Sequence, residues 1–308
     1  MDVSAPISRW PTRRLAVGLL LLWGQLLAIA AGHFDPGNTL RELGYEMVEL
    51  RRTSDNHLFL FGKVEGRRRS CLVDTGWSFT TVSTNAAAQL SETNRIHQLT
   101  LGRVVLADEP VLVQDLRANG QPTSYDVVLG CDFLLRHHAV TDVAGRRLFL
   151  RAAELSAPKQ AQLALTLSQG GLVEIAMKRR EPWALTCQAE VQGRPVELLV
   201  DSGAAWSCLD LAVARDLKLH VVPTLNRIMG PAAAKRRNFA VADLKSWRLG
   251  GQAMPETSVA VFSLTEWGLG PTGKLFDDVG GILGGSELFA RCAVIDCGAA
   301  KLWLRTQR

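Results

Sequence analysis

Two patterns of alternating apolar and polar residues, far apart in the chain, follow the same course. In each pattern a strand-like run reaches a turn, and a second apolar run then leads to an aspartate, at residues 64–74 and 191–201. The step from the turn glycine to the aspartate is eight residues in both copies. Similar short runs bounded by Gly, Pro and Asn dominate the chain, and helical periodicity is convincing only at residues 85–90 and 209–217. The sequence therefore predicts a mainly β protein.

The repetition continues beyond the two aspartates. Two apolar residues followed by glycine occur at Val128-Leu129-Gly130 and again at Ile282-Leu283-Gly284. From each of these glycines, 12 residues lead to a further aspartate, Asp142 or Asp296, and 8 more lead to the end of a predicted closing strand. Two triplets of Asp, Thr or Ser, and Gly with matching segments on both sides are a strong sign of an internal duplication.

The duplication sets the domain organisation that we expect. Residues 47–50 and 172–175 match as the first strand of each copy. A stretch rich in small and polar residues at 151–171 separates the copies and is typical of a linker. We therefore predict an N-terminal lobe at residues 32–154 and a C-terminal lobe at residues 155–308.

The first 31 residues have the pattern of a targeting segment. Arg9, Arg13 and Arg14 precede an apolar run at residues 15–31 that ends in small residues. A run of about 17 residues is at the lower limit for a helix that spans a membrane, so a cleaved signal peptide is favoured over an uncleaved anchor. We expect export to a periplasmic or extracellular location, with membrane contact only if this segment stays uncleaved.

Composition narrows the class of function further. The 308 residues carry a formal net charge of +5, but the short basic clusters are dispersed and no aromatic residues interleave with them, which argues against nucleic-acid binding. No cysteine pair has the spacing of metal ligands, so we expect neither a metal nor a cofactor. The six cysteines follow the targeting segment, where disulfides can form, and the sequence does not choose between pairings and unpaired, buried thiols.

The repeated residues resemble the pepsin and retropepsin superfamily of aspartic peptidases, and in particular retropepsin-like units fused in tandem. The resemblance covers residues 48–304 and rests on the Asp-Thr-Gly at 74–76, the Asp-Ser-Gly at 201–203 and the two later apolar-apolar-Gly segments. It implies two closed β-barrel lobes of the acid-protease type, related by a pseudo-two-fold axis, with an active-site cleft between them. Since one chain supplies both aspartates, we expect an active monomer.

The resemblance also implies a role for each residue of the motif. Asp74 and Asp201 would be the catalytic pair, sharing one proton and activating a water molecule for attack on a peptide bond. No covalent intermediate and no metal is needed. Supporting roles, in fixing the carboxylates and allowing close approach of the backbone, fall to Thr75, Gly76, Ser202, Gly203, Gly130 and Gly284.

The sequence departs from the family pattern near the cleft. Trp77 follows the first triplet where a small residue is usual, and Ala204 follows the second; the indole would either shape or obstruct a subsite. Neither tyrosine, Tyr45 or Tyr125, lies at a recognisable flap position. The second copy has 49 residues from Asp201 to its Leu-Gly turn against 28 in the first, which predicts one dominant flap on the second lobe, with Met229 and Gly230 near its tip.

Two functions follow from these observations. The first is an exported aspartic endopeptidase that hydrolyses polypeptides with Asp74 and Asp201. The second is a weakly active or inactive peptide-binding module that keeps the fold and holds an extended peptide by strand addition. Both aspartates, both hydroxyl residues and both glycines are present, which favours the enzyme, whereas Trp77 is the best argument for the binding module.

Overall fold

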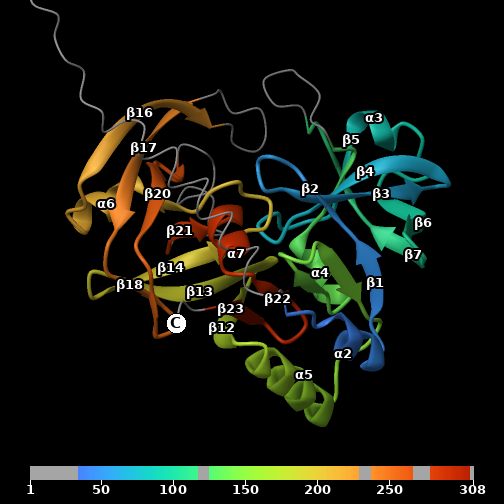
Figure 1. The fold of residues 1–308 in the computed structure, drawn as a ribbon. Coiled ribbons are helices and arrows are strands. Elements are labelled where there is room, and N and C mark those ends of the chain that lie inside the picture. The colour runs from blue at the N-terminus through green and yellow to red at the C-terminus, as the bar shows by residue number, and fades with distance from the viewer. Residues whose placement is uncertain (1–33, 117–124, 229–236, 266–277, 306–308) are drawn as a thin grey trace, which may run out of the picture. The chain divides into compact units, whose positions relative to one another are not determined.

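Strand pairs joined by tight turns form both copies of the repeat, as the alternating patterns predict (Figure 1). The structure, a computed structural model, describes residues 34–116, 125–228, 237–265 and 278–305. Glu65-Gly66 and Gln192-Gly193 form the two turns with positive φ, which glycine adopts without strain. The hairpins that lead to the aspartates are β3 (Leu58–Val64) with β4 (Arg67–Val73), and β13 (Ala184–Val191) with β14 (Arg194–Val200).

The first copy builds an eight-stranded sheet in the order β7-β6-β3-β4-β9-β5-β8, with β2 paired to β3. Strand β9 runs parallel to β4, so a chain segment distant in sequence lies beside the strand that ends at Asp74. The other elements of this copy are α2 (Gly37–Glu42), β1 (Glu46–Glu49), β2 (Arg51–Arg52), β5 (Thr81–Ser83), α3 (Thr84–Ala87), β6 (Arg95–Leu101), β7 (Val104–Pro110), β8 (Leu112–Gln114), β9 (Val127–Leu129), α4 (Cys131–Arg136), β10 (Val140–Asp142) and β11 (Arg147–Leu150).

The second copy repeats this order and adds a hairpin of β16 and β17 before the turn at 249–252. Strand β21 runs parallel to β14, as β9 does to β4. Its elements are β12 (Leu172–Arg180), β15 (Cys208–Asp210), α6 (Leu211–Asp216), β16 (Val221–Ile228), β17 (Arg237–Leu244), β18 (Trp247–Leu249), β19 (Gln252–Met254), β20 (Thr257–Phe262), β21 (Val279–Leu283), α7 (Gly285–Ala290), β22 (Val294–Asp296) and β23 (Lys301–Arg305).

A sheet shared by both copies joins them, and the sequence patterns do not predict it. Its order runs β1-β11-β10-β22-β23-β12, so strands of the first copy meet strands of the second between β10 and β22. In this antiparallel pair Thr141 lies opposite Ile295, Val140 opposite Asp296 and Asp142 opposite Val294. Residues 35–308 thus form a single compact unit with a continuous hydrogen-bonded connection between the copies.

The segment that we interpreted as a linker is largely helical. Helix α5 (Ala157–Gln169) follows Ser156, has Pro158 in its first turn and packs against β12. Its buried face contains Leu163 and Leu167. The lobe boundaries at 154 and 155 stay a prediction.

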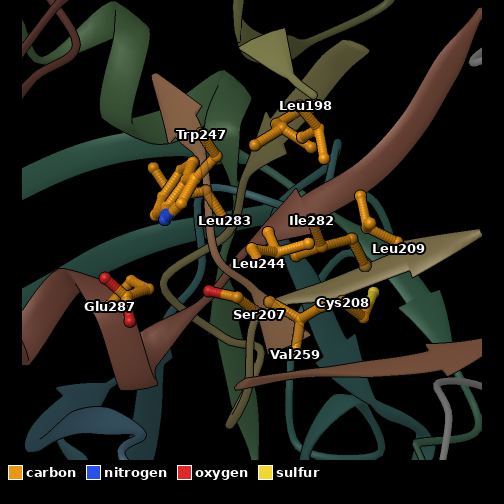
Figure 2. Close-up of a pocket in the computed structure, with 11 residues that line it drawn as sticks. Leu198, Ser207, Cys208, Leu209, Leu244, Trp247, Val259, Ile282, Leu283 and Glu287 are labelled. Carbon is orange, nitrogen blue, oxygen red and sulfur yellow. The ribbon is translucent and has the colours of Figure 1, made fainter. Parts of the chain in front are cut away.

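The second lobe contains a small cavity among the strands of its core (Figure 2). Apolar side chains line most of it, including Leu198, Trp247 and Ile282. The polar members are already paired, since Ser207 Oγ accepts the amide of Gly284 at 3.0 Å and Glu287 accepts from Thr257 and Arg291. The cavity is therefore a packing feature of the β core.

All six cysteines have free thiols, and five of them are buried. Burial raises the pKa of Cys71, Cys131 and Cys187 to about 12, so these groups stay protonated within the apolar interior. The targeting segment at 1–31 lies outside the described residues. In the part of the chain that the structure describes, no helix is both long and apolar enough to cross a bilayer.

Candidate active site

Asp74 and Asp201 lie in equivalent places at the ends of parallel strand pairs. Asp74 follows β4, and its amide donates to the carbonyl of Leu129 in β9 at 3.1 Å. Asp201 follows β14, and its amide donates to the carbonyl of Leu283 in β21 at 3.0 Å. Each aspartate is therefore fixed by the apolar-apolar-Gly segment of its own lobe.

Backbone amides hold one oxygen of each carboxyl group in the same way. Asp74 Oδ1 accepts the amides of Gly76 at 2.9 Å and Trp77 at 3.0 Å. Asp201 Oδ1 accepts the amides of Gly203 at 2.8 Å and Ala204 at 2.9 Å. Because backbone amides bind Oδ1 in both residues, Oδ2 is the carboxyl oxygen that remains available for proton transfer.

The hydroxyl residues connect the two lobes directly beneath the aspartates. Thr75 Oγ1 donates to the carbonyl of Val200 at 2.7 Å and accepts the amide of Ser202 at 2.9 Å. Ser202 Oγ donates to the carbonyl of Val73 at 2.9 Å and accepts the amide of Thr75 at 3.1 Å. Both side chains are buried, so this reciprocal set of four hydrogen bonds ties the two loops together away from water.

The two glycines of the triplets bring each carboxyl group against the opposite loop. A Cβ atom added to Gly76 would lie 2.2 Å from Cγ of Asp201, and one added to Gly203 would lie 2.1 Å from Oδ2 of Asp74. Contacts this short leave no space for a side chain at either position. The carboxyl groups of Asp74 and Asp201 consequently face each other across the junction of the lobes.

This proximity perturbs the titration of both groups. Burial raises the pKa of Asp74 well above its usual range, and the charge of Asp201 and a hydrogen bond to it raise it further. Burial also raises the pKa of Asp201, while the hydrogen bond with Asp74 and the amides of Gly203 and Ala204 oppose the rise. Both shifts favour a protonated carboxyl group, and two carboxylates this close do not ionise together at low cost, which is the condition for sharing one proton.

Gly130 and Gly284 lie under the active loops. A Cβ at Gly130 would approach the backbone carbon of Phe79 to 2.6 Å, and one at Gly284 would approach the carbonyl oxygen of Trp206 to 2.4 Å. The amides that follow complete the packing, because Cys131 donates to the carbonyl of Trp77 and Gly285 to that of Ala204, both at 2.7 Å.

The structure describes two of the four residues that we predicted to line the cleft, Trp77 and Ala204. The half-buried indole of Trp77 donates from Nε1 to Oγ1 of Thr81 at 2.8 Å, which holds the ring on its own lobe. Ala204 packs against an apolar cluster of the second lobe. Met229 and Gly230 lie outside the described residues, between β16 and β17, so the flap stays a prediction.

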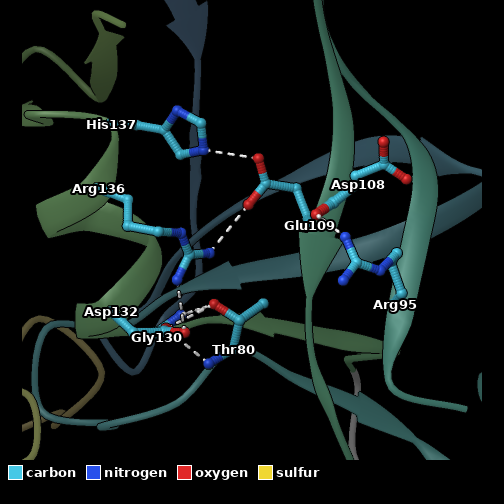
Figure 3. A network of polar contacts seen from close by, with 8 residues as sticks. All are labelled: Thr80, Arg95, Asp108, Glu109, Gly130, Asp132, Arg136 and His137. Carbon is cyan, nitrogen blue, oxygen red and sulfur yellow. Dashed lines mark hydrogen bonds and ion pairs between the residues drawn. The ribbon is translucent and has the colours of Figure 1, made fainter. Parts of the chain in front are cut away.

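A polar network behind the first active loop was not predicted from the sequence (Figure 3). Thr80 donates from both its amide and its hydroxyl to Asp132 Oδ1 at 2.7 Å. Arg136 then joins Asp132 to the buried Glu109, at 3.0 Å and 2.9 Å, and His137 Nε2 lies 2.7 Å from the same carboxylate. This network fixes the loop after Asp74 on α4 and β7.

In the second lobe, fewer charged side chains hold the loop that follows Asp201. Ser207 donates its amide to Oγ of Ser286 at 3.0 Å, in the place of the contact between Thr80 and Asp132. Only the matching position of a hydroxyl, six residues after each aspartate, could have indicated these contacts in the sequence.

A second group that the sequence analysis missed lies near the pair on the first lobe. His57 and Tyr125 are 68 positions apart, and Nδ1 of the imidazole lies 3.2 Å from the tyrosine hydroxyl. No local motif marks either residue. Within the described residues, no group of three or more His, Cys, Asp or Glu side chains is arranged to hold a metal ion.

A comparison with protein families identifies a match to this chain. Residues 187–286 match the family model described as aspartyl protease. None of the curated proteins matches the chain significantly. Among solved structures the chain is similar to an aspartic proteinase from Irpex lacteus, with 15% identity and a TM-score of 0.48, covering 86% of this chain and 98% of that one.

The matched region contains Asp201, Ser202, Gly203 and Gly284, and the first lobe repeats the same arrangement around Asp74. The second copy of the duplication therefore resembles the aspartyl protease family, and the first copy repeats the same arrangement around its own aspartate.

Proposed function

We propose that this protein is an aspartic endopeptidase that hydrolyses polypeptides with Asp74 and Asp201 as its catalytic residues. The observation that carries the proposal is the pair of carboxyl groups, one from each lobe, with Asp74 buried and Asp201 half-buried, at two loops that Thr75 and Ser202 tie together. A pair of this kind provides a general base and a general acid in one site.

The geometry supports a different role for each aspartate in the reaction. Asp201, as the carboxylate, would take a proton from a water molecule while the water oxygen bonds to the scissile carbonyl carbon. Asp74 would give its proton to the carbonyl oxygen, which forms a neutral diol. Asp74 then takes a proton back from one diol hydroxyl, Asp201 donates its proton to the amide nitrogen, and the C–N bond breaks with both groups restored.

A peptide library offered to the purified protein tests this activity. Wild type should cut internal bonds at acidic pH, and a hydroxyethylene transition-state mimic should inhibit it. Asp74→Asn and Asp201→Asn should each lower kcat by at least about 100-fold, since each removes one proton-transfer group. Substantial cleavage by either folded variant would contradict the proposal, and a loss of activity with a chelator would point to metal chemistry instead.

The second candidate function is a peptide-binding module without turnover. The half-buried Trp77 favours it, because Trp77 donates its own amide to Asp74 and thus adds a bulky ring in the loop that holds this carboxyl group. Mass spectrometry separates the two functions. Intact peptide recovered with the protein would support binding, whereas fragments absent from the Asp201→Asn sample would support the enzyme.

We further propose that the chain acts after export, as a periplasmic or extracellular monomer. The basic residues and the apolar run at 15–31 support export. Both carboxyl groups come from one polypeptide, which supports activity without a second chain.

A further inference from the structure

The two lobes differ in the side chains at two equivalent positions of the duplication. In the first lobe, His57 precedes β3 and Tyr125 precedes β9, and their rings lie 5.9 Å apart between centroids with a hydrogen bond between them. The duplicated hairpins and the duplicated apolar-apolar-Gly segments place Ala184 and Val279 at the equivalent positions of the second lobe. Those two residues pack together in an apolar cluster. The first lobe therefore presents a titratable pair where the second presents hydrocarbon.

The turn that carries His57 packs on the loop that holds Asp201. Asn56 Nδ2 donates to the carbonyl of Ala205 at 3.0 Å, and a Cβ added to Gly285 would lie 2.6 Å from Cβ of Asn56. Ala205 follows Ala204, whose amide binds Asp201. His57, which is half-buried, directly follows Asn56 and so belongs to a first-lobe turn that packs against the loop of Asp201.

The groups around His57 define its electrostatic surroundings. Burial lowers its pKa, and the negative charges of Asp55, in its own turn, and of Asp201 oppose that shift. Tyr125 meets it from the start of β9, and burial raises the pKa of this phenol to about 12, so it stays neutral. His57 in return is one of the influences that lower the pKa of Asp201.

We propose that His57, oriented by Tyr125, is a positioning residue that faces the carboxyl pair and, as the imidazolium at acidic pH, keeps Asp201 ionised. The inference rests on the proposed peptidase function, because Asp201 must be a carboxylate to accept a proton from water. The imidazolium of His57 should shift the pH dependence of activity in one direction. A positive charge near Asp201 favours the carboxylate, so His57 extends activity toward lower pH.

The pH dependence of kcat/KM tests this role in the reaction. His57→Gln keeps a polar side chain beside Tyr125 but removes the charge, so the acid limb of the profile should move to higher pH. The alkaline limb, where His57 is already neutral and Asp74 loses its proton, should stay in place. His97→Gln is the matched control, because this exposed imidazole pairs with Asp108 on the hairpin of β6 and β7. Superimposable profiles of His57→Gln and wild type would overturn the proposal.

An NMR titration of the imidazoles gives a readout that needs no turnover. In Asp201→Asn the midpoint of His57 should fall, since the opposing carboxylate is gone, while the midpoint of His97 should stay unchanged. An unchanged His57 midpoint would overturn the proposal even in an active enzyme. If wild type cuts no peptide but the His57 midpoint moves, the electrostatic pairing stands and the peptidase function fails.

Discussion

At the residue scale, the hydroxyls of Thr75 and Ser202 hold the two halves of the site in register. Each accepts an amide from the opposite triplet and donates to the carbonyl that precedes the opposite aspartate. Thr75 is fully buried and Ser202 nearly so. Since an unpaired buried polar group costs free energy, the stability of this junction and the position of the carboxyl groups depend on the same side chains.

Two substitutions at Thr75 distinguish the contribution of its hydroxyl group from that of its side-chain shape. In Thr75→Val the carbonyl of Val200 and the amide of Ser202 lose a partner, which should lower the free energy of unfolding by about 2 kcal/mol or more. The displaced carboxyl groups should lower kcat by roughly 100-fold. Thr75→Ser keeps the hydroxyl and should retain most of both quantities. Urea unfolding and peptide kinetics measure them, and a Val variant as active as the Ser variant would show that the hydroxyl is dispensable.

At the scale of elements, the shared sheet places two equivalent aspartates in different surroundings. Asp142 in β10 forms an ion pair with Arg147 at 2.5 Å. Asp296 in β22 accepts the amide of Ala299 at 2.9 Å, and burial raises its pKa from 3.8 to about 6. The duplication thus kept both carboxyl groups, but Asp142 forms a direct ion pair, whereas Lys301 and Arg179 act on Asp296 only through their charges.

Because of this difference, replacement of the aspartate by asparagine should have opposite effects on stability at the two positions. A group with a raised folded-state pKa stabilises the protein below its unfolded pKa, and this contribution is lost as the pH rises through the folded value. For Asp296 the loss falls between about pH 4 and 6 and amounts to roughly 3 kcal/mol at most. Asp296→Asn should therefore be more stable than wild type at pH 7.5 and similar at pH 4, as measured by urea unfolding.

Asp142→Asn serves as the comparison, because it removes the buried one of the two carboxylate partners of Arg147, the other being Asp35, and should be less stable than wild type at pH 7.5. If Asp296→Asn were also destabilised at pH 7.5, burial of its charge would not be costly and the assignment would fail.

At the scale of the whole molecule, residues 35–308 provide both carboxyl groups within one unit. Strands β10 and β22 connect the copies through backbone hydrogen bonds, and the loops with Thr75 and Ser202 connect them again beneath the site. This arrangement is the basis for our proposal that the protein acts as a monomer.

Specific activity should consequently be independent of protein concentration. We expect the same kcat/KM from micromolar to low nanomolar concentrations, with light scattering at the upper end showing a monomer. A steep fall of activity per chain upon dilution would mean that the active unit needs a partner, as expected for enzymes with one triplet per chain.

Local sequence patterns were sufficient to predict the strands that the duplication repeats and the mainly β fold. Strand alternation predicted a mainly β fold. The two triplets, Asp-Thr-Gly and Asp-Ser-Gly, and the segments that end at Gly130 and Gly284 predicted the pairing of Asp74 with Asp201. The signals of α5 were also present, in Ser156, the early proline and Gly170, but the small residues in this stretch led us to interpret it as a linker.

Only the tertiary structure decided what lies between segments remote in sequence. The contact between β10 and β22 and the hydrogen bond of His57 with Tyr125 join residues that no local pattern relates. The same holds for the link from Thr80 through Asp132 and Arg136 to Glu109. Periodicity reports which face of a strand is buried, whereas the choice of partner depends on packing between surfaces that form only when the chain has folded. The sequence determined the two halves of the site, and the fold determined their surroundings.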